Sequence, residues 1–343
     1  MALYPLVRPL VFRFDAERAH GLTLRGLKLL PAGKGEAPDP LLGIRVAGLD
    51  FPNPVGLAAG FDKNGEVYRQ ILGLGFGFAE VGTLTPRPQA GNPKPRLFRL
   101  AEDRAVINRM GFNNEGIGAA HVRLAGRKRN GVVGVNVGAN KESADRVADY
   151  AEGVRRMAPV ADYLTVNISS PNTPGLRALQ DKGALDELLS TVMEARGDTP
   201  LFLKVAPDLQ RAEIDDISAI SMKWGVDALI VANTTLSRPA LRSSRRDEAG
   251  GLSGAPLKEL ALERLRDFRS ATGGAMPLIG AGGIESGVDA YARIRAGASL
   301  VQLYSALVYE GPGLARRIAA ELRDLLRRDG FARADEAVGT EKR

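Results

Sequence analysis

The residues best suited to chemistry lie in one stretch, Asn167–Arg177. It contains two asparagines, two serines and a threonine, while two prolines and a glycine exclude a helix. The apolar run Tyr163–Val166 precedes it and predicts a buried strand. These polar groups therefore follow the C-terminal end of a strand, where α/β proteins usually place their chemistry. The alternative is a loop that only caps its own backbone.

Polar residues also follow the other predicted strands, which favours a site over a single capped loop. Asn108, Asn172 and Asn233 both donate and accept hydrogen bonds, so together they can match the alternating N–H and C=O groups of a planar imide or pyrimidine. Lys63 can hold a carboxylate on such a substrate. For each asparagine alone, an Asx-turn is the commoner use.

Glycines and hydroxyls after the last two predicted strands suit a phosphate group. Gly282–Gly283 and Tyr304–Ser305 occupy these positions, and Gly254 can add a further backbone amide. Glycines that serve only tight turns are the alternative. A phosphate here suggests a phosphorylated cofactor such as FMN, and Lys204 would then stabilise negative charge on the reduced flavin ring.

Eight short apolar runs alternate with amphipathic helical segments, which predicts a (β/α)8 barrel. The strands are expected at Val55–Ala59, Phe78–Gly82, Val132–Val137, Tyr163–Val166, Leu201–Val205, Ala228–Ala232, Leu278–Gly280 and Leu300–Leu303. The helices are expected at Glu66–Leu74, Ala144–Met157, Leu185–Ala195, Glu213–Trp224, Leu257–Phe268, Val288–Ala296 and Leu314–Leu326. A hairpin is expected around Ile44–Phe51. A doubly wound sheet is the alternative, but its Gly-x-Gly-x-x-Gly turn is missing after the first strand.

The first 40 residues differ from the rest of the chain. Apolar residues at helical spacing alternate with arginines and a lysine, which predicts two short basic amphipathic helices followed by a Pro/Gly-rich linker. Such helices can lie in a membrane interface, and a helix pair covering one end of the main domain is the alternative. We therefore divide the chain into an extension and linker (1–40), a barrel (41–328) and a polar tail (329–343) that we expect to be frayed.

Composition narrows the function further. The net charge of +7 and the pI near 9.7 suggest an anionic partner, but 6% aromatic content and no long basic block argue against nucleic acid. Cysteine is absent, which excludes disulfides, thiolate metal sites and a cysteine base. With only His20 and His121, neither a metal site nor a Ser-His-Asp triad is expected. No apolar run is long enough to span a bilayer, and no signal peptide is evident.

Five motifs in this order closely resemble the dihydroorotate dehydrogenase family, over about Tyr4 to Leu325. They are Ala59–Lys63, Thr85–Gln89, Asn108–Asn114, Asn167–Arg177 and Gly251–Gly254. The resemblance implies an FMN-dependent barrel enzyme that oxidises (S)-dihydroorotate to orotate in pyrimidine biosynthesis. It makes Ser170 the base that takes the C5 proton while the C6 hydride passes to flavin N5.

The resemblance also implies which residues bind each molecule. FMN would contact Ala59, Gly60, Phe61, Asp62, Lys63, Thr83, Asn136, Asn167, Lys204, Ala232, Gly254, Gly283, Tyr304 and Ser305. The substrate would contact Lys63, Asn108, Arg109, Met110, Gly111, Phe112, Asn167, Asn172, Asn233 and Thr234. Because a serine hydroxyl has a pKa far above neutral, its proton must move on through water or a neighbour such as Thr173.

The serine base also indicates the electron acceptor. Soluble members of the family that use fumarate or NAD have a cysteine base, whereas the membrane-associated class has a serine and an N-terminal helical extension. The resemblance therefore implies a monomer attached peripherally to the cytoplasmic side of the cell membrane. Ubiquinone or menaquinone would enter between the helices, past His20, Arg99 and Tyr304.

Three further alternatives remain open. The arginine-rich segment Leu241–Gly251 is either a mobile loop that closes over substrate or an inert surface loop. A dihydrouridine synthase that grips tRNA is a rival function, but it would be favoured by a cysteine acid, which is absent. A membrane-associated scaffold with a degenerate barrel would bind no flavin.

Overall fold

The computed structural model describes residues 4–33 and 35–341. Residues 1–3, 34 and 342–343 belong to the predicted extension, linker and tail, and they lie outside the described residues.

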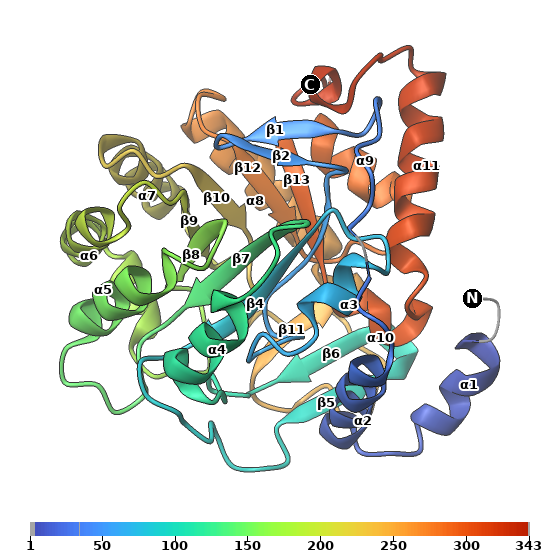
Figure 1. Ribbon diagram of the computed structural model, residues 1–343, viewed down its shortest axis with the longest axis horizontal. Helices are drawn as coiled ribbons and strands as arrows, with labels where there is room; N and C mark the ends of the chain where they lie inside the picture. The colour runs from blue at the N-terminus through green and yellow to red at the C-terminus, as the bar shows by residue number, and fades with distance from the viewer. Residues whose placement is uncertain (1–3, 34, 342–343) are drawn as a thin grey trace.

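The eight predicted strands form a closed parallel barrel (Figure 1). Their order is β3-β4-β7-β8-β9-β10-β12-β13. The bounds are Val55–Leu57 (β3), Phe78–Leu84 (β4), Val132–Val137 (β7), Tyr163–Asn167 (β8), Leu201–Val205 (β9), Ala228–Val231 (β10), Leu278–Ala281 (β12) and Ala298–Leu303 (β13). Every predicted strand is present, and the ends differ by at most two residues. The (β/α)8 prediction is confirmed.

Helices follow the strands and cover the outside of the barrel. They are Tyr68–Leu72 (α3), Gly116–Ala125 (α4), Arg146–Met157 (α5), Lys182–Ala195 (α6), Arg211–Lys223 (α7), Lys258–Ala271 (α8), Gly287–Arg295 (α9), Ala306–Glu310 (α10) and Leu314–Arg328 (α11). The sequence pattern does not predict α4 or α10. Two glycines near the start of α4 weaken its helical signal, and α10 has only five residues.

The predicted hairpin of β1 (Ile44–Val46) and β2 (Leu49–Phe51) closes the N-terminal end of the barrel. The Phe51 ring lies 5.1 Å from Phe78, and Tyr163 stacks on Phe202 at 4.4 Å between ring centres. Phe51 ends the hairpin, the other three rings come from the first two residues of barrel strands, and all four side chains are almost fully buried. This end is therefore a packed core, so a site must lie at the opposite end.

A three-stranded antiparallel sheet lies at that opposite end (Figure 1). It contains β5 (Leu97–Leu100), β6 (Ala105–Asn108) and β11 (Gly251–Gly254), in the order β11-β6-β5. Its buried face contains Phe98, Leu100, Ile107 and Leu252. The sequence did not predict this sheet, because its strands have four residues each and β11 is contributed by a segment far along the chain.

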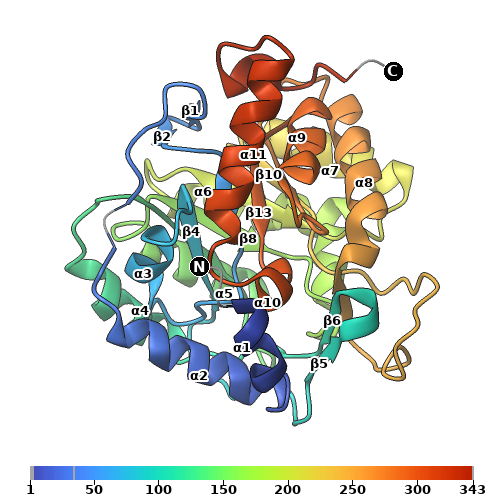
Figure 2. The same cartoon turned by 90° about the vertical axis from the view of Figure 1, so that its right-hand side faces the viewer.

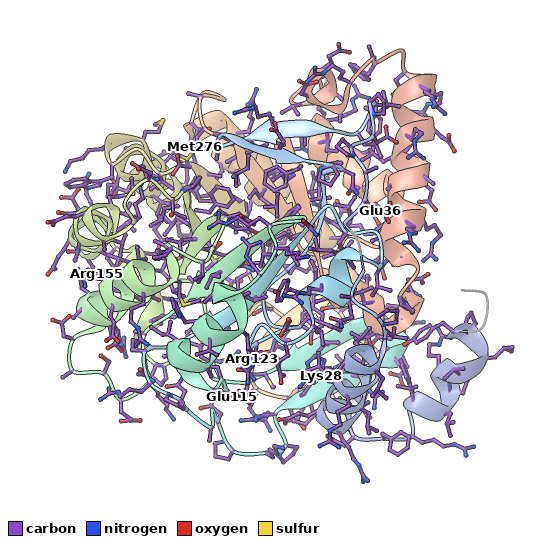
Figure 3. The ribbon with its side chains drawn as sticks, in the orientation of Figure 1. Lys28, Glu36, Glu115, Arg123, Arg155 and Met276 are labelled. Carbon is purple, nitrogen blue, oxygen red and sulfur yellow. The ribbon has the colours of Figure 1, made fainter. Side chains whose placement is uncertain are left out.

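The two predicted N-terminal helices are present as α1 (Tyr4–Val11) and α2 (Ala16–Leu29). Helix α2 lies beside β5, and α1 lies beside α10 (Figures 1 and 2). The Asp15 carboxylate caps α2 by accepting from two backbone N–H groups at 3.0 Å. Glu17 of α2 pairs with the buried Arg96 at 2.7 Å, and Lys28 (labelled in Figure 3) pairs with Glu66. Within the described ranges, no helix has the length and apolar character needed to cross a bilayer.

The described part of the tail, residues 329–341, packs against the main domain, so the expectation of a frayed tail was wrong for these residues. After α11 the chain forms a short helix at Ala334–Ala337, and both of these alanines are fully buried. The Ala334 N–H donates to Leu41 at 2.8 Å, and the Gly339 N–H donates to Ile294 at 3.1 Å. Small side chains let this polar segment pack closely against the main domain. The charge pattern of the sequence does not predict this packing. The linker is fixed on the same side, where Glu36 pairs with Arg316 at 3.1 Å (Figure 3).

Candidate active site

One cavity of about 550 Å³ lies at the C-terminal ends of the barrel strands. It continues between the barrel and the two N-terminal helices. We call these two helices, α1 and α2, the roof. Of the residues predicted for the site, all but three line it. They are His20, Ala59, Gly60, Phe61, Lys63, Thr83, Arg99, Asn108, Met110, Gly111, Phe112, Asn167, Ser170, Asn172, Lys204, Ala232, Asn233, Thr234, Gly254, Gly283, Tyr304 and Ser305.

Two consecutive serines follow β8, and they have different surroundings. The Ser169 hydroxyl donates to the Asn167 side chain at 2.8 Å and accepts from Asn233 at 2.9 Å, so it holds the loop together. Ser170 lines the cavity, and its hydroxyl oxygen accepts the Asn172 backbone N–H at 3.3 Å. The Ser170 hydroxyl is therefore placed to act on a molecule in the cavity.

Asparagines from separate loops meet beside Ser170. The Asn172 amide donates to the Asn108 side chain at 3.2 Å, which joins the β8 loop to the end of β6. Asn233 follows β10, and its amide oxygen accepts the Thr234 N–H at 2.8 Å. All three asparagines line the same cavity, and they give it a wall of donors and acceptors. That this wall binds a substrate ring stays a prediction.

Lys63 supplies a positive charge at the border between this wall and the roof. Its amine donates to the Gly60 carbonyl at 2.7 Å. Burial lowers the pKa of the Lys63 amine to about 8, and the charge of Glu17 partly opposes that effect. The amine is therefore mostly protonated at neutral pH and can bind an anionic substrate.

His20 of α2 faces the same border from the roof. Its ring lies edge-on to Phe61 at 5.2 Å and 6.3 Å from the Tyr304 ring. Burial, together with the neighbouring Lys63 charge, lowers the pKa of His20 to about 3. Its buried Nε2 has no hydrogen-bond partner among the described residues. His20 is thus neutral at physiological pH, with a ring nitrogen available to a bound molecule.

Arg99 of β5 connects the sheet to the roof. Its guanidinium lies 4.6 Å from the Phe12 ring centre and donates to the backbone carbonyls of Val11 at 3.3 Å and of Phe14. Under the roof the cavity is lined largely by apolar residues, including Ala19 and Leu27 of α2 and Leu30 directly after it. This part of the cavity suits a hydrophobic ligand with a polar head.

Glycines form a cradle at the other end of the cavity. Gly254 has a φ of +97°, and a Cβ there would lie 2.4 Å from the Arg104 carbonyl oxygen. Gly283 has a φ of +71°, and a Cβ there would lie 2.4 Å from the Lys258 Cα. Only glycine fits either position. The cavity-lining hydroxyl of Ser305, 2.8 Å from that of Ser253, adds a polar group to this cradle.

Comparison with known proteins identifies the family. The model of the family described as "Dihydroorotate dehydrogenase" matches residues 41–326. The chain belongs to the dihydroorotate dehydrogenase family. Proteins named dihydroorotate dehydrogenase (quinone) from Novosphingobium aromaticivorans and Erythrobacter litoralis are each 64% identical to it, covering 99% of this chain and 100% of theirs. A crystal structure from Eimeria tenella, in complex with ferulenol, superposes with a TM-score of 0.90 at 43% identity and covers 95% of both chains.

Dihydroorotate dehydrogenases are flavin-dependent in general, and the cavity fits a flavin. Its volume lies within the usual range for cofactor pockets. The glycine cradle can receive a phosphate, because its backbone can approach the oxygens closely. The fully buried side-chain oxygen of Gln302, a residue that lines the cavity, has no hydrogen-bond partner among the described residues. A flavin ring carries donors that can satisfy such an oxygen.

Three predicted residues of the dihydroorotate dehydrogenase site do not line the cavity. The Asp62 carboxylate is buried and accepts the Glu66 and Val67 N–H groups, so it holds the turn before α3. Arg109 points away and pairs with Glu248 at 2.8 Å. Asn136 lies one layer below the cavity, where its side chain contacts other polar groups of the barrel. Their neighbours in the motifs, rather than these side chains, face the ligand space.

Sequence analysis missed Glu80 and Gln302, which lie in the middle of β4 and near the end of β13. Both are fully buried and hydrogen-bonded to each other at 2.8 Å. With Asn136, Thr165 and Lys204 they form a polar layer that we call the floor of the cavity. A charged or amide residue inside an otherwise apolar strand was the available signal.

The arginine-rich segment Leu241–Gly251 is docked in this structure. The Asp103 carboxylate accepts the backbone N–H groups of Arg242 at 2.8 Å and Ser243 at 3.0 Å, and Leu241 is buried. The segment ends where β11 begins, next to β6. Its closing over substrate stays a prediction.

Proposed function

We propose that this chain oxidises (S)-dihydroorotate to orotate and passes the electrons through FMN to a membrane quinone. The family, and the names of relatives that cover the whole chain, support this activity. The observation that carries the proposal is one cavity that contains Ser170, the asparagine wall and Lys63 at one place and an apolar arm under the roof at another.

The substrate would lie against the wall beside Ser170. Asn108, Asn172 and Asn233 would bind the N–H and C=O groups of the ring, together with Thr234. Lys63 would hold the carboxylate, and the remaining predicted contacts, Met110, Gly111, Phe112 and Asn167, complete the enclosure. Fixing a small flat ring on several sides aligns its C5–H bond with one base, which is the main requirement for a weak base to act.

Ser170 would take the C5 proton. That proton is α to a carbonyl, and FMN, when bound, accepts the hydride from the adjacent carbon, so a hydroxyl held in place can serve as the base. The proton must then leave the serine. Thr173 is buried nearby in the same loop, and its hydroxyl has no hydrogen-bond partner among the described residues, so it is available to pass the proton on.

FMN would lie between the glycine cradle and the floor. Gly254, Gly283, Tyr304 and Ser305 would bind its phosphate end, and Lys204 would stabilise negative charge on the reduced ring. The other residues proposed around the ring are Ala59, Gly60, Phe61, Thr83, Asn167 and Ala232. Asp62 and Asn136 would act indirectly, through the turn and the polar layer that they hold.

The quinone, ubiquinone or menaquinone, would enter under the roof and approach the flavin past His20, Arg99 and Tyr304. The outer surface of the roof supports peripheral attachment to the cytoplasmic side of the cell membrane. Leu6, Leu10 and Leu29 are 76%, 56% and 87% exposed, next to exposed Arg18 and Arg25. This combination of apolar and basic side chains suits a membrane interface. We propose that the protein acts as a monomer.

Anaerobic titration tests the proposal directly. Adding dihydroorotate to the purified yellow protein should bleach the flavin absorbance, and later addition of a soluble quinone should restore it. Protein that is colourless and takes up no flavin would contradict the cofactor. A flavin that dihydroorotate does not bleach, but that dithionite does, would contradict the substrate.

A further inference from the structure

Glu80 has no role in the sequence motifs, yet four side chains hold it at the centre of the floor. Its Oε1 accepts from the Asn136 amide at 2.8 Å. Its Oε2 accepts from the Gln302 amide at 2.8 Å and from the hydroxyls of Tyr163 and Thr165, each at 3.1 Å. The residue is fully buried, and no described lysine or arginine lies within 4.0 Å of it.

These contacts indicate that Glu80 is a carboxylate. All four partners present a donor to Glu80, namely the NH2 groups of Asn136 and Gln302 and the hydroxyls of Tyr163 and Thr165, and an ionised carboxyl group can accept from all of them. The orientation of the Asn136 amide is fixed because its oxygen accepts from Thr83 at 2.6 Å and from Asn167 at 3.2 Å. Burial and the Glu80 charge raise the pKa of Tyr163 well above its usual value, so its hydroxyl also keeps its proton.

The opposite charge in this layer belongs to Lys204 of β9. Burial lowers the pKa of the Lys204 amine, and Glu80 is the charged group that opposes this effect. Lys204 and Gln302 both line the cavity, whereas Glu80 does not. The Glu80 charge therefore acts on the ligand space through two neighbours, one by charge and one by hydrogen bonding. A buried charge without a counter-charge is costly, so the Glu80 charge and the Lys204 charge each lower the cost of burying the other across the layer, without direct contact.

We propose that Glu80 is a positioning residue of the flavin site, which balances the charge of Lys204 and fixes the amides of Asn136, in the layer below, and of Gln302, which lines the cavity. The proposal rests on the proposed function, because it takes a flavin as the occupant. In this proposal two residues of the floor act on the flavin ring. Lys204 faces the ring, and Glu80 limits the net positive charge near it.

The first test replaces Glu80→Gln, which removes the charge with little change in shape. The control is Thr165→Val, which removes one hydrogen bond to the same carboxylate and leaves its charge. The full-length protein is titrated with oxidised and reduced FMN at pH 6. In Glu80→Gln the unbalanced Lys204 charge should favour the reduced form by at least about tenfold over the oxidised form, or ~30 mV for a two-electron couple. The control should change this ratio less than about threefold. If the ratio of affinities for reduced and oxidised FMN were equal in Glu80→Gln and Thr165→Val, the proposal would be overturned.

The second test measures thermal unfolding of the full chain, with and without added FMN. Removing one of two buried opposite charges is expected to lower Tm by about 5–10 °C in a chain of this size, because the other charge then stays buried without a counter-charge. Lys204→Met with Glu80→Gln should recover at least half of the loss caused by Glu80→Gln alone, because no lone charge remains. Strictly additive losses, or a double variant that fails to fold while Lys204→Met folds, would overturn the proposal.

The two tests separate this inference from the proposed function. If the protein binds no flavin at all, the proposed function fails, but the unfolding of the flavin-free variants still shows whether Glu80 and Lys204 are coupled. In the other case, flavin binds and dihydroorotate reduces it, but Glu80→Gln does not change the ratio of affinities for reduced and oxidised FMN, and Tm does not recover in the double variant. Only the role of Glu80 then fails.

Discussion

The floor and the roof enclose the same cavity but are stabilised in different ways. In the floor, Glu80, Asn136, Thr165 and Gln302 are fully buried and joined by hydrogen bonds across four barrel strands. In the roof, α1 buries none of its residues and α2 buries only Ala19 and Leu27. The floor is therefore part of the global fold, whereas the roof can separate from it at a much lower free energy.

This difference matches the two half-reactions proposed for the protein. Proton and hydride removal need groups fixed to within a fraction of an ångström, which a barrel end provides. A long hydrophobic acceptor needs an entrance that can open, and helices held by a few contacts such as Arg96–Glu17 and Arg99–Phe12 provide one. Perturbing the roof should thus affect the acceptor, and perturbing the floor should affect the flavin.

Removing residues 1–35 should give the largest difference between the reaction assigned to the roof and the reaction assigned to the barrel. Quinone-dependent turnover should fall at least about a hundredfold, together with its dependence on detergent or lipid, because the binding surface for the quinone head is lost. Reduction of the flavin by dihydroorotate should remain, since the family match begins only at residue 41. Steady-state quinone assays and anaerobic stopped-flow reduction measure the two reactions. Unchanged quinone kinetics in the truncated protein would exclude the proposed entrance.

The pH dependence should report on Lys63, which lies at the border of the two regions. Its folded-state pKa of about 8 is below that of an ordinary lysine, so the amine is charged below pH 8 and neutral above it. If the charged amine binds the substrate carboxylate, kcat/KM for dihydroorotate should fall above pH 8, approaching about tenfold per pH unit. A profile that stays level from pH 7.5 to 9.5 would argue against this role.

A smaller effect should follow from the helix caps. Asp15→Ala removes the cap of α2, and Ser286→Ala removes the cap of α9, where the serine accepts the Asp289 N–H at 3.2 Å. Each loses about 1 kcal/mol of local stabilisation. Asp15→Ala should raise the KM for quinone and leave the global Tm nearly unchanged, whereas Ser286→Ala should lower Tm by about 2 °C and leave that KM unchanged. If Asp15→Ala instead lowered the global Tm and left the KM for quinone unchanged, the roof would unfold together with the barrel.

The barrel was predictable from the sequence because fully buried parallel strands appear as short apolar runs. The meeting of Asn172 and Asn233 was predictable because both follow barrel strands, whose ends meet on one face, whereas Asn108 ends β6, which is not a barrel strand. The sheet of β5, β6 and β11 was not, because its pairing joins segments separated by more than 140 residues. The packing of the tail through Ala334 and Ala337 also depends on contacts that no local pattern encodes.

The direction in which a side chain points was the other property that the sequence could not predict. Motifs name neighbouring residues together, but Asp62 and Arg109 point away from the ligand space that their neighbours line. Ser169 and Ser170 could not be distinguished by type, and only the hydrogen bonds of Ser169 to Asn167 and Asn233 show which hydroxyl remains for the cavity. Glu80 was overlooked because a single charge inside an apolar run has no motif, although its burial makes it central to the floor.

The most direct measurement is the rate of flavin reduction by dihydroorotate in Ser170→Ala, followed anaerobically by stopped flow. Ser169→Ala is the control, since it removes the adjacent hydroxyl, which does not line the cavity. We predict that Ser170→Ala still binds FMN and orotate but reduces the flavin at least about a hundredfold more slowly, and that Ser169→Ala slows it less than about tenfold. Near-normal reduction in Ser170→Ala would show that another group is the base.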